Sequence, residues 1–264
     1  MNRYVLLCVV VLGSASCAGV PRIEKPQFTQ RYYTYSVLFT PEKPSNSPQL
    51  DLALSLLRME YPADQAEALH NILYGQASLD VYKDFIIIEQ RRNYRGKAAD
   101  IPSNGGGPAR YAEKFTIKHI YEQGIVIERD LQTYYGGAHP DRITQYYNIE
   151  FDTDRFKQVN FDDLFTSYQE DHQFRDIVYD ELREYSNLIS TQSLSQGIYF
   201  NNQPELTFNF FITEGGLGLH WDPAQIAPYS YGSIQIILPW YMVRPLMLPT
   251  GIDLLAKFNV YLAE

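Results

Sequence analysis

One histidine stands in a segment whose residue types could carry chemistry. His139 and Asp141 belong to the run Tyr134-Tyr135-Gly136-Gly137-Ala138-His139-Pro140-Asp141. A histidine acts as a general base when a carboxylate orients it and a nucleophile lies within reach. The chain contains neither Gly-x-Ser-x-Gly nor His-Glu-x-x-His, which would supply a serine nucleophile or a zinc site. We therefore expect this segment to contact a ligand or support the fold and assign no catalytic residue.

Other residues suited to metal or acid–base chemistry lack the necessary spacing. No two of the five histidines have the spacing of paired metal ligands, and no cysteine accompanies them: His70, His119, His139, His172 and His220. Asp152 and Asp154 begin an Asp-x-Asp pattern, but the glycine and final glutamate of a calcium loop do not follow. Residues 60–67 contain several carboxylates that could supply the acid pair of a glycosidase, although nothing in the sequence places two of them across a cleft. We predict no metal and no cofactor.

Alternating and helical patterns predict the elements that position these residues. Period-two alternation, as in Tyr33, Tyr35 and Val37, predicts strands over residues 31–40, 50–56, 115–121, 125–131, 143–151, 206–213, 217–221 and 233–238. Helical spacing and capping residues predict helices over residues 62–74, 80–94 and 171–187. Because strands and helices are grouped and do not alternate strictly, we predict an α+β fold. Antiparallel sheets would carry helices on one face.

The predicted helix over residues 80–94 has two notable faces. Val81, Phe85 and Ile88 share one face, which we expect to point inward. Arg91, Arg92 and Arg95 form a basic cluster near the end of the helix. Cations are favoured at a helix C-terminus, so a solvated last turn is preferred to a binding patch.

The N-terminus has the pattern of an export signal. Arg3 precedes an apolar run over residues 4–12, and small residues lead to Cys17. Residues 14–17 resemble a bacterial lipobox, in which the cysteine thiol receives a diacylglycerol. Ser14 stands where leucine is usual, and Ala15 would also permit ordinary cleavage. We expect a signal peptide over residues 1–16, lipidation at Cys17 and a tether over residues 17–30.

Composition and charge define the expected domains and partners. The glycine-rich stretch within residues 97–110 predicts a boundary between a small α+β sub-domain, 31–110, and a larger one, 111–264. The net charge is −9, and removing Arg3 with the signal makes it −10. This acidic balance argues against nucleic acid and against electrostatic docking on anionic lipid, and it favours a basic partner.

Three segments in the same order resemble a known family. The Tyr134–Pro140 run is similar to the Tyr-x-Gly-Gly-Ala-His motif of the extracellular C-terminal domain of the RsiV anti-sigma factor. Residues 162–165, Asp-Asp-Leu-Phe, and the long segment from Phe211 to Trp240 match later parts of that domain. The same domain occurs in the non-catalytic N-terminal region of PdaC-type peptidoglycan deacetylases. The resemblance spans residues 111–246, and residues 31–110 would correspond to the companion domain by element order alone.

The resemblance implies a receptor-like module outside the cell, because the RsiV domain binds lysozyme. It adds Tyr229, in the Ile-Ala-Pro-Tyr turn, to the ligand-binding candidates Tyr134, Tyr135, Gly136, Gly137, His139 and Asp141. We therefore expect an exported, lipid-anchored and non-catalytic binding or sensing module of the bacterial cell envelope. Its ligand would be a basic protein such as lysozyme, or a peptidoglycan fragment. An envelope hydrolase using His139 and an accessory structural lipoprotein remain as alternatives.

Overall fold

The computed structural model describes residues 26–38, 49–61, 66–97, 109–151, 155–166 and 172–262. The predicted signal peptide and residues 17–25 of the predicted tether, including Cys17, lie outside the described residues, as do residues 98–108 of the glycine-rich stretch. Residues 27–30, predicted as tether, instead belong to a strand. Among the residues that are described, no helix combines the length and apolar character needed to cross a membrane.

The chain divides into two compact units, which are described separately. The first unit comprises Met1–Thr116, Arg129–Ile143 and Thr153–Phe156. The second comprises Ile117–Glu128, Thr144–Asp152 and Lys157–Glu264. The units are therefore interleaved along the sequence. The division at residue 110 expected from composition stays a prediction.

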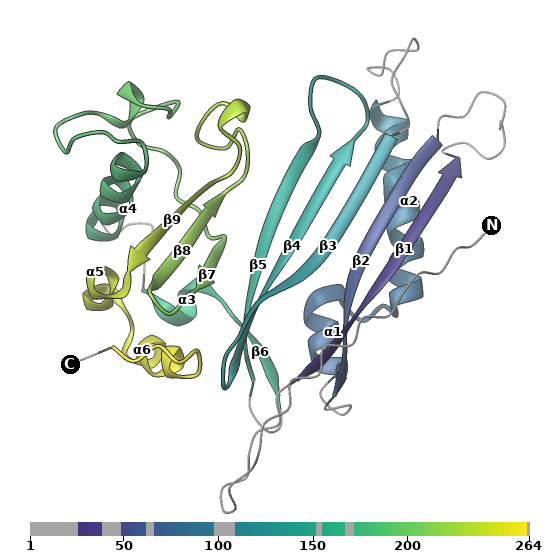
Figure 1. Cartoon of the computed structure of the whole chain (residues 1–264), viewed down its shortest axis with the longest axis horizontal. Coiled ribbons are helices and arrows are strands. Elements are labelled where there is room, and N and C mark those ends of the chain that lie inside the picture. Colours follow the sequence, from purple (N-terminus) through teal and green to yellow (C-terminus); the bar gives the residue numbers. More distant parts are fainter. Residues whose placement is uncertain are drawn as a thin grey trace, which may run out of the picture. The chain divides into compact units, whose positions relative to one another are not determined.

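A sheet with the strand order β1-β2-β3-β4-β5-β6 organises the first half of the chain (Figure 1). Its strands are β1 (Gln27–Leu38), β2 (Gln49–Tyr61), β3 (Ala109–Ile120), β4 (Gly124–Tyr134), β5 (Asp141–Phe151) and β6 (Phe156–Val159). β1 and β2 pair antiparallel, with Tyr33 opposite Leu54. β2 and β3 instead pair parallel, with Leu52 opposite Tyr111. This pair departs from the antiparallel arrangement expected from the sequence.

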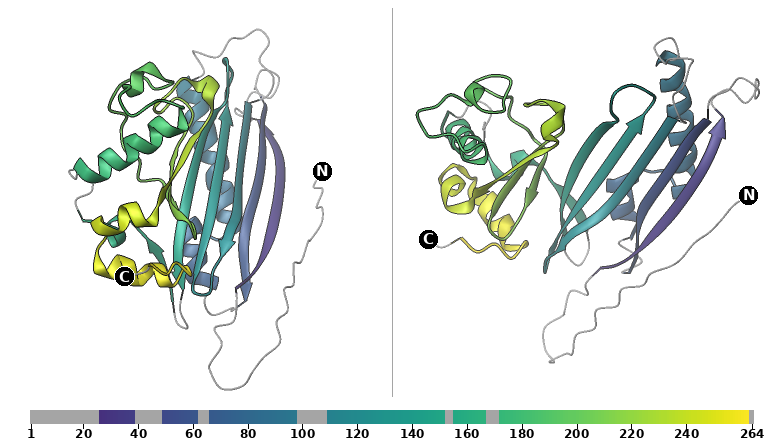
Figure 2. Two further views of the ribbon diagram at one scale, coloured as in Figure 1. Left: turned by 60° about the vertical axis from the view of Figure 1, so that its left-hand side comes forward. Right: turned by 45° about the horizontal axis from the view of Figure 1, so that its top comes forward.

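The parallel pair exists because two helices connect β2 to β3, as a parallel connection requires. These helices are α1 (Ala66–Tyr74) and α2 (Leu79–Lys97), and both lie on the same face of the sheet (Figures 1 and 2). Leu50, Leu52, Leu54 and Leu56 of β2 are all buried, as the alternating pattern predicts. The Tyr74 hydroxyl of α1 donates to the carbonyl oxygen of Leu57 at 2.9 Å and accepts from its N–H at 2.7 Å, which fixes α1 on β2.

The prediction for the inner face of α2 is wrong. Val81, Phe85 and Ile88 are 57%, 54% and 60% exposed, whereas Ile86 and Gln90 are 6% exposed. The helix thus turns its apolar stripe outward and a mixed face toward the sheet. Tyr82 explains part of this orientation, because its hydroxyl donates to Glu113 Oε1 of β3 at 2.8 Å. Leaving a buried carboxylate without a hydrogen-bond donor costs more free energy than leaving an apolar stripe exposed to solvent.

The second unit surrounds a smaller sheet with the order β7-β8-β9 and carries an aromatic core. Its further elements are α3 (Phe161–Leu164), α4 (His172–Tyr185), β7 (Phe210–Ile212), β8 (Gly216–Trp221), β9 (Ile234–Pro239), α5 (Trp240–Val243) and α6 (Pro249–Ala256). The helix predicted over residues 171–187 is present as α4, with Phe174, Val178 and Leu182 buried and Tyr185 46% exposed. The two antiparallel pairings of this sheet and the helices beside it complete the predicted α+β fold.

Candidate functional site

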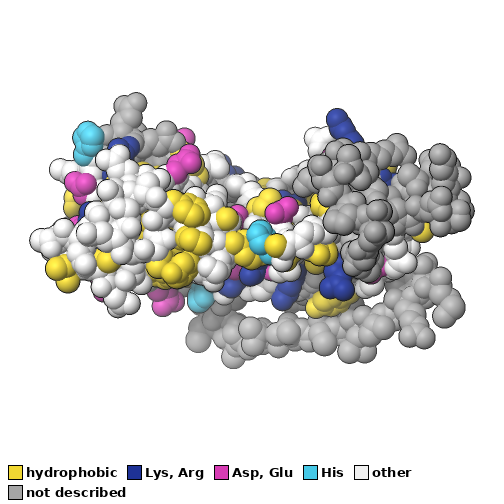
Figure 3. Space-filling view, turned by 90° about the horizontal axis from the view of Figure 1, so that it is seen from above, with side chains coloured by type: hydrophobic (Ala, Val, Ile, Leu, Met, Phe, Trp, Pro, Cys, Tyr) yellow, Lys and Arg dark blue, Asp and Glu magenta, His cyan; other side chains and the backbone are white. Residues whose placement is uncertain are grey.

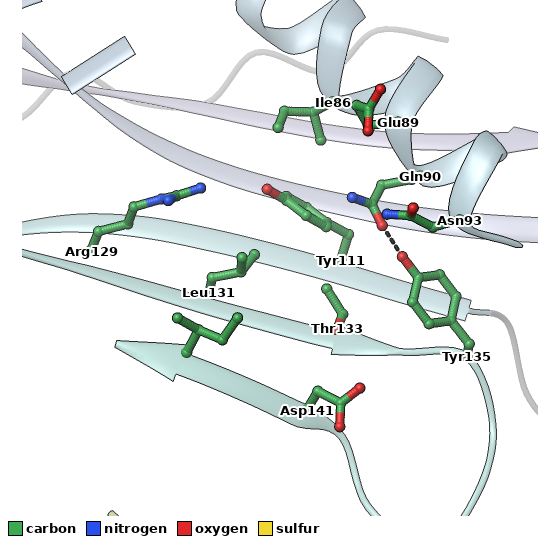
Figure 4. Close-up of a pocket in the computed structure, with 11 residues that line it drawn as sticks. Ile86, Glu89, Gln90, Asn93, Tyr111, Arg129, Leu131, Thr133, Tyr135 and Asp141 are labelled. Carbon is green, nitrogen blue, oxygen red and sulfur yellow. Dashed lines mark hydrogen bonds between the residues drawn. The ribbon is translucent and has the colours of Figure 1, made fainter. Parts of the chain in front are cut away.

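A cavity of about 470 Å³ lies in the first unit between α2 and the helix-facing side of β3, β4 and β5 (Figure 4). This cavity is the groove. Arg129, Leu131 and Thr133 line it from alternate positions of β4, and Tyr135 continues this alternation past the end of the strand. At roughly 3.3 Å per residue, the distance along the chain from Arg129 to Tyr135 is about 20 Å. The groove therefore has the length of a short extended peptide or a small oligosaccharide.

One end of the groove is rich in polar groups. The Tyr135 hydroxyl donates to Oε1 of the buried Gln90, which joins the β4–β5 connection to α2 (Figure 4). Burial and the nearby Asp141 carboxylate raise the pKa of Tyr135, while a hydrogen bond with Asn93 acts in the opposite direction. The hydroxyl is therefore protonated at neutral pH and acts as a donor. Asp141 itself is exposed.

The other end carries a cation that is already paired. Arg129 Nε donates to Glu113 Oε1 at 2.6 Å, and the exposed fractions of the two side chains are 23% and 0%. Burial and the Glu113 charge raise the pKa of Tyr111, outweighing the charge and hydrogen bond of Arg129. Glu113 Oε2 is buried without a hydrogen-bond partner among the described residues. Because Glu113 neutralises Arg129, the lining offers little free positive charge.

The β4–β5 connection holds most of the residues predicted from the motif. Gly136 and Gly137 have φ values of 105° and 110°, a region that L-residues rarely adopt, so the Gly-Gly pair shapes this turn. The Tyr134 hydroxyl donates to the carbonyl oxygen of Gly137 at 3.1 Å and closes the loop. His139 is exposed, and its Nδ1 lies 3.4 Å from the carbonyl oxygen of Pro140.

The structure brings together some of the predicted site residues. Tyr135 and Asp141 line the groove. Tyr134, Gly136, Gly137 and His139 lie in the adjoining loop or at its start. Tyr229 belongs to η3 (Tyr229–Tyr231), a short 3-10 helix of the second unit. Cys17 lies outside the described residues.

Sequence reasoning missed the groove residues contributed by α2 and β4. The sequence patterns predict only a helix at Glu89, Gln90 and Asn93 and a strand at Arg129, and Thr133 lies beyond the predicted strand 125–131. One signal was available, because the alternation Arg129, Leu131, Thr133 runs directly into Tyr135. Tyr135 should therefore share a face with them. No local pattern identifies the α2 residues that lie over this face.

The second unit contains a buried polar network around His220, which is 2% exposed. Its Nε2 lies 3.0 Å from Asp222 Oδ1, and its Nδ1 lies 2.8 Å from Gln235 Nε2. Asp222 Oδ1 also accepts from the N–H of Thr144 at 2.8 Å. Both ring nitrogens are thus engaged in contacts that join β5, β8 and β9. The His-Asp pair is suited to holding these strands together and not to proton transfer with a substrate.

Glu128 extends the same network. It accepts from the Tyr146 hydroxyl at 2.7 Å and from Lys118 Nζ at 3.1 Å. Burial acts to raise the pKa of Glu128, but the hydrogen bonds from Tyr146 and Lys118 and the charges of Lys118 and His220 lower it overall. In the described part of the chain, no three His, Cys, Asp or Glu side chains are grouped to hold a metal ion.

The mixed six-stranded sheet and the smaller three-stranded sheet make this an α+β protein, and the groove beside α2 is its candidate site. Residues 162–241 match a family described as "Protein of unknown function (DUF3298)". No curated protein matches the sequence.

Two solved structures share the fold. A crystal structure of a DUF3298 family member from Bacteroides fragilis has a TM-score of 0.68 and 18% identity, over 86% of this chain and 95% of that one. A DUF3298 family protein from Pseudomonas aeruginosa has a TM-score of 0.56 and 15% identity, over 87% of this chain and 97% of that one. At such identities the likeness shows the fold alone.

Proposed function

We propose that this chain is an exported, lipid-anchored binding module of the bacterial cell envelope, and that its groove binds a basic protein of the lysozyme type. The export signal, the lipobox-like Cys17 and the resemblance to the RsiV domain support the location and the class. The groove supports the mode of action, because it offers hydrogen-bonding groups and no constellation for turnover.

The charge of the groove is the observation that carries this proposal. Two carboxylates, Glu89 and Asp141, line it, and its cation Arg129 is paired with Glu113. Arg92 lies 3.8 Å from Glu89, but this guanidinium is 81% exposed and is held weakly. The Asp141 end therefore favours a lysine or arginine side chain of a partner. The net charge of −9 would steer a basic protein toward the same chain.

Titration with a c-type lysozyme at low and near-physiological salt tests this function. The protein is residues 18–264, which include every described residue. We expect saturable 1:1 binding that survives salt. Asp141→Asn removes one groove carboxylate, so it should weaken binding about two- to tenfold, as loss of a partly exposed charge pair would. Asp253→Asn on α6 changes the net charge equally at an exposed position and should leave the affinity unchanged.

Two results would count against the groove as the lysozyme site. Binding that disappears at modest salt would reflect only nonspecific attraction of opposite charges. Equal weakening by Asp141→Asn and Asp253→Asn would show that net charge, and not the groove, sets the affinity.

A peptidoglycan fragment is the second candidate ligand. The groove presents amide and hydroxyl groups from Gln90, Asn93, Thr133 and Tyr135 around the apolar side chains of Leu131 and Ile143. This combination suits a sugar that carries both hydroxyl and acetamido groups. Soluble peptidoglycan fragments that bind and compete with lysozyme would place both ligands in the groove. Release of labelled products would instead support the hydrolase alternative.

A further inference from the structure

The outward face of α2 leaves apolar side chains in solvent. Val81, Phe85 and Ile88 occupy positions i, i+4 and i+7 and are each more than half exposed. Residues at this spacing form one continuous stripe along a helix. The inward face is occupied by Ile86 and Gln90, so the helix cannot bury the stripe against its own sheet. Exposed hydrophobic side chains also gather in patches elsewhere, between scattered charges (Figure 3), so exposure alone does not distinguish α2.

The end of α2 nearer Val81 is acidic on its outer surface. The side chains of Asp80 and Asp84 are 82% and 67% exposed. Lys83 Nζ lies 3.8 Å from Asp80 Oδ1 and 3.4 Å from Asp84 Oδ1, and the lysine side chain is only 18% exposed. One mostly covered lysine therefore serves two exposed aspartates, and the surface beside the stripe keeps a negative charge.

The end nearer Ile88 is basic. Arg92, eleven positions after Val81, lies on the same face as the stripe, and its side chain is 81% exposed. Arg92 Nη1 is 3.8 Å from Glu89 Oε1, and an exposed pair at this distance contributes little free energy. Arg91 donates from Nε to the carbonyl oxygen of Leu38 at 3.1 Å, a neutral acceptor that does not cancel its charge. Two arginines and one glutamate leave this end with a positive charge.

The stripe and its two charged ends match a second copy of themselves. In an antiparallel pair of α2 helices, a two-fold axis halfway between Phe85 and Ile88 sets each of these residues opposite the other in the second copy. Arg92 then lies opposite Val81 of the second copy, within its acidic end. Apolar side chains meet apolar side chains, and each basic end meets an acidic end. A parallel pair would instead bring like charges together, which is unfavourable.

We propose that the outward face of α2 pairs antiparallel with the same face of a second copy and so forms a symmetric dimer. The exposed aspartates beside the stripe disfavour an anionic lipid surface in its place. Residues 80–92 extend over about 18 Å of helix, so the contact belongs to the small class of interfaces. We therefore expect a reversible dimer with a dissociation constant on the order of 10 µM.

The net charge of −9 opposes the association of two copies at long range. Physiological salt screens this repulsion beyond about 8 Å, whereas the charges that meet at the helix ends are closer than that. The dimer should therefore be measured at physiological salt, where the local charge pairs and the apolar contact outweigh the repulsion between the whole chains.

Sedimentation velocity of residues 18–264 at concentrations from about 1 to about 500 µM tests the dimer. The wild-type protein should change from monomer to dimer within this range. V81S/F85S/I88S should raise the dissociation constant more than about 100-fold, because three apolar side chains of each copy no longer pack against the other copy.

A charge exchange tests the antiparallel arrangement. D84R and R92E should each weaken the dimer about tenfold, because each brings like charges together at both ends of the symmetric contact. D84R/R92E should recover an affinity within about threefold of the wild type, because opposite charges meet again. D253R on α6 makes the same change in net charge as D84R at an exposed position and should not weaken the dimer.

The double variant Y241S/Y261S is the control for the apolar stripe. These tyrosines of the second unit are 77% and 76% exposed, so their replacement removes exposed aromatic surface without touching α2. The dimer of this control should be as stable as that of the wild type. All of these variants change exposed positions and should keep the wild-type circular dichroism spectrum.

Three outcomes would overturn the dimer proposal. The first is a wild-type protein that stays monomeric over the whole concentration range. The second is wild-type dimerisation in V81S/F85S/I88S, or an equal loss in Y241S/Y261S. The third is a D84R/R92E dimer no tighter than that of the weaker single variant. Lysozyme titration at protein concentrations well below the dissociation constant of the dimer measures the monomer, so the two proposals fail separately.

Discussion

Tyr135 connects the β4–β5 loop to α2 through the hydrogen bond that its hydroxyl donates to Gln90. Gln90 is buried, so removal of the Tyr135 hydroxyl leaves the side-chain carbonyl oxygen of Gln90 without this hydrogen bond. Unpaired buried acceptors cost more than the net value of the bond that satisfied them. The residue therefore contributes to stability as well as to the groove lining.

Tyr135→Phe should lower the free energy of unfolding by about 1–3 kcal/mol, because the Gln90 acceptor loses its partner. Tyr134→Phe is the neighbouring control, since its hydroxyl serves an exposed bond to Gly137. That change should cost less than about 0.5 kcal/mol. Urea denaturation of both variants measures the difference. Equal effects would show that the Gln90 bond does not contribute more than the surface bond.

Glu128 predicts a specific pH dependence. Its pKa is lowered in the folded protein, so the unfolded chain binds a proton more readily. The resulting stabilisation is present above the unfolded pKa, near 4.5, and is lost as pH falls through the lower folded pKa. Glu128→Gln should therefore destabilise the protein at pH 7 and progressively less below pH 4.5. Denaturation series at several pH values test this, and a destabilisation that stays constant from pH 7 to below pH 4 would contradict it.

At the scale of elements, α2 shows where periodicity misleads. The apolar stripe predicts the inward face, yet the buried residues are Ile86 and Gln90. The orientation depends on Tyr82, which reaches Glu113 on a strand that follows α2 in the sequence. The order of apolar and polar residues within a helix does not reveal a contact with an element that comes later in the chain.

A pair of adjacent substitutions tests this orientation directly. Ile86→Ala should cost about 2–4 kcal/mol of unfolding free energy, because it leaves a cavity against the sheet. Phe85→Ala, one position earlier, should change it by less than about 0.5 kcal/mol, because that ring is half exposed. Thermal or urea unfolding of the two variants is sufficient. The reverse ranking would restore the orientation expected from periodicity.

Most strands and the long α4 helix could be predicted, because each depends on its own alternation or stripe. The four buried leucines of β2 and the Phe174, Val178, Leu182 stripe follow from the order of residues alone. The parallel pairing of β2 with β3 could not be predicted, because the pattern of residues in a strand does not show which other strand pairs with it. The groove was missed in part for the same reason: Tyr135 and Asp141 lie in a motif, whereas Gln90 and Asn93 come from α2.

At the scale of the whole molecule, the segment that matches the DUF3298 family is shorter than the folded unit to which it belongs. Residues 162–241 lack the contributions of β3, β4, β5 and α6 to the second unit. The buried cluster of that unit includes Tyr121, Val126, Tyr146, Leu255 and Phe258, all outside the segment. The segment alone would expose the faces that these residues cover.

A fragment of residues 162–241 should therefore be unfolded in isolation, with a collapsed amide dispersion in its NMR spectrum. Residues 18–264 should show the dispersion of a folded protein under the same conditions. A fragment with native-like dispersion and a cooperative thermal transition would show that the remaining core of β7, β8, β9 and α4 suffices by itself.

The parallel pairing of β2 and β3 also has a kinetic consequence. Leu50 pairs with Ala109, which lies 59 positions later in the sequence. β2 and β3 can therefore pair only after the segment that forms α1 and α2 is present. Contacts between distant parts of a chain form slowly, because the entropy of the intervening loop is lost first. During the proposed export, the leucines of the β1–β2 hairpin would stay exposed to solvent until β3 pairs with β2. If the chain is exported as proposed, this hairpin is where it would be most vulnerable to aggregation and would most need a chaperone.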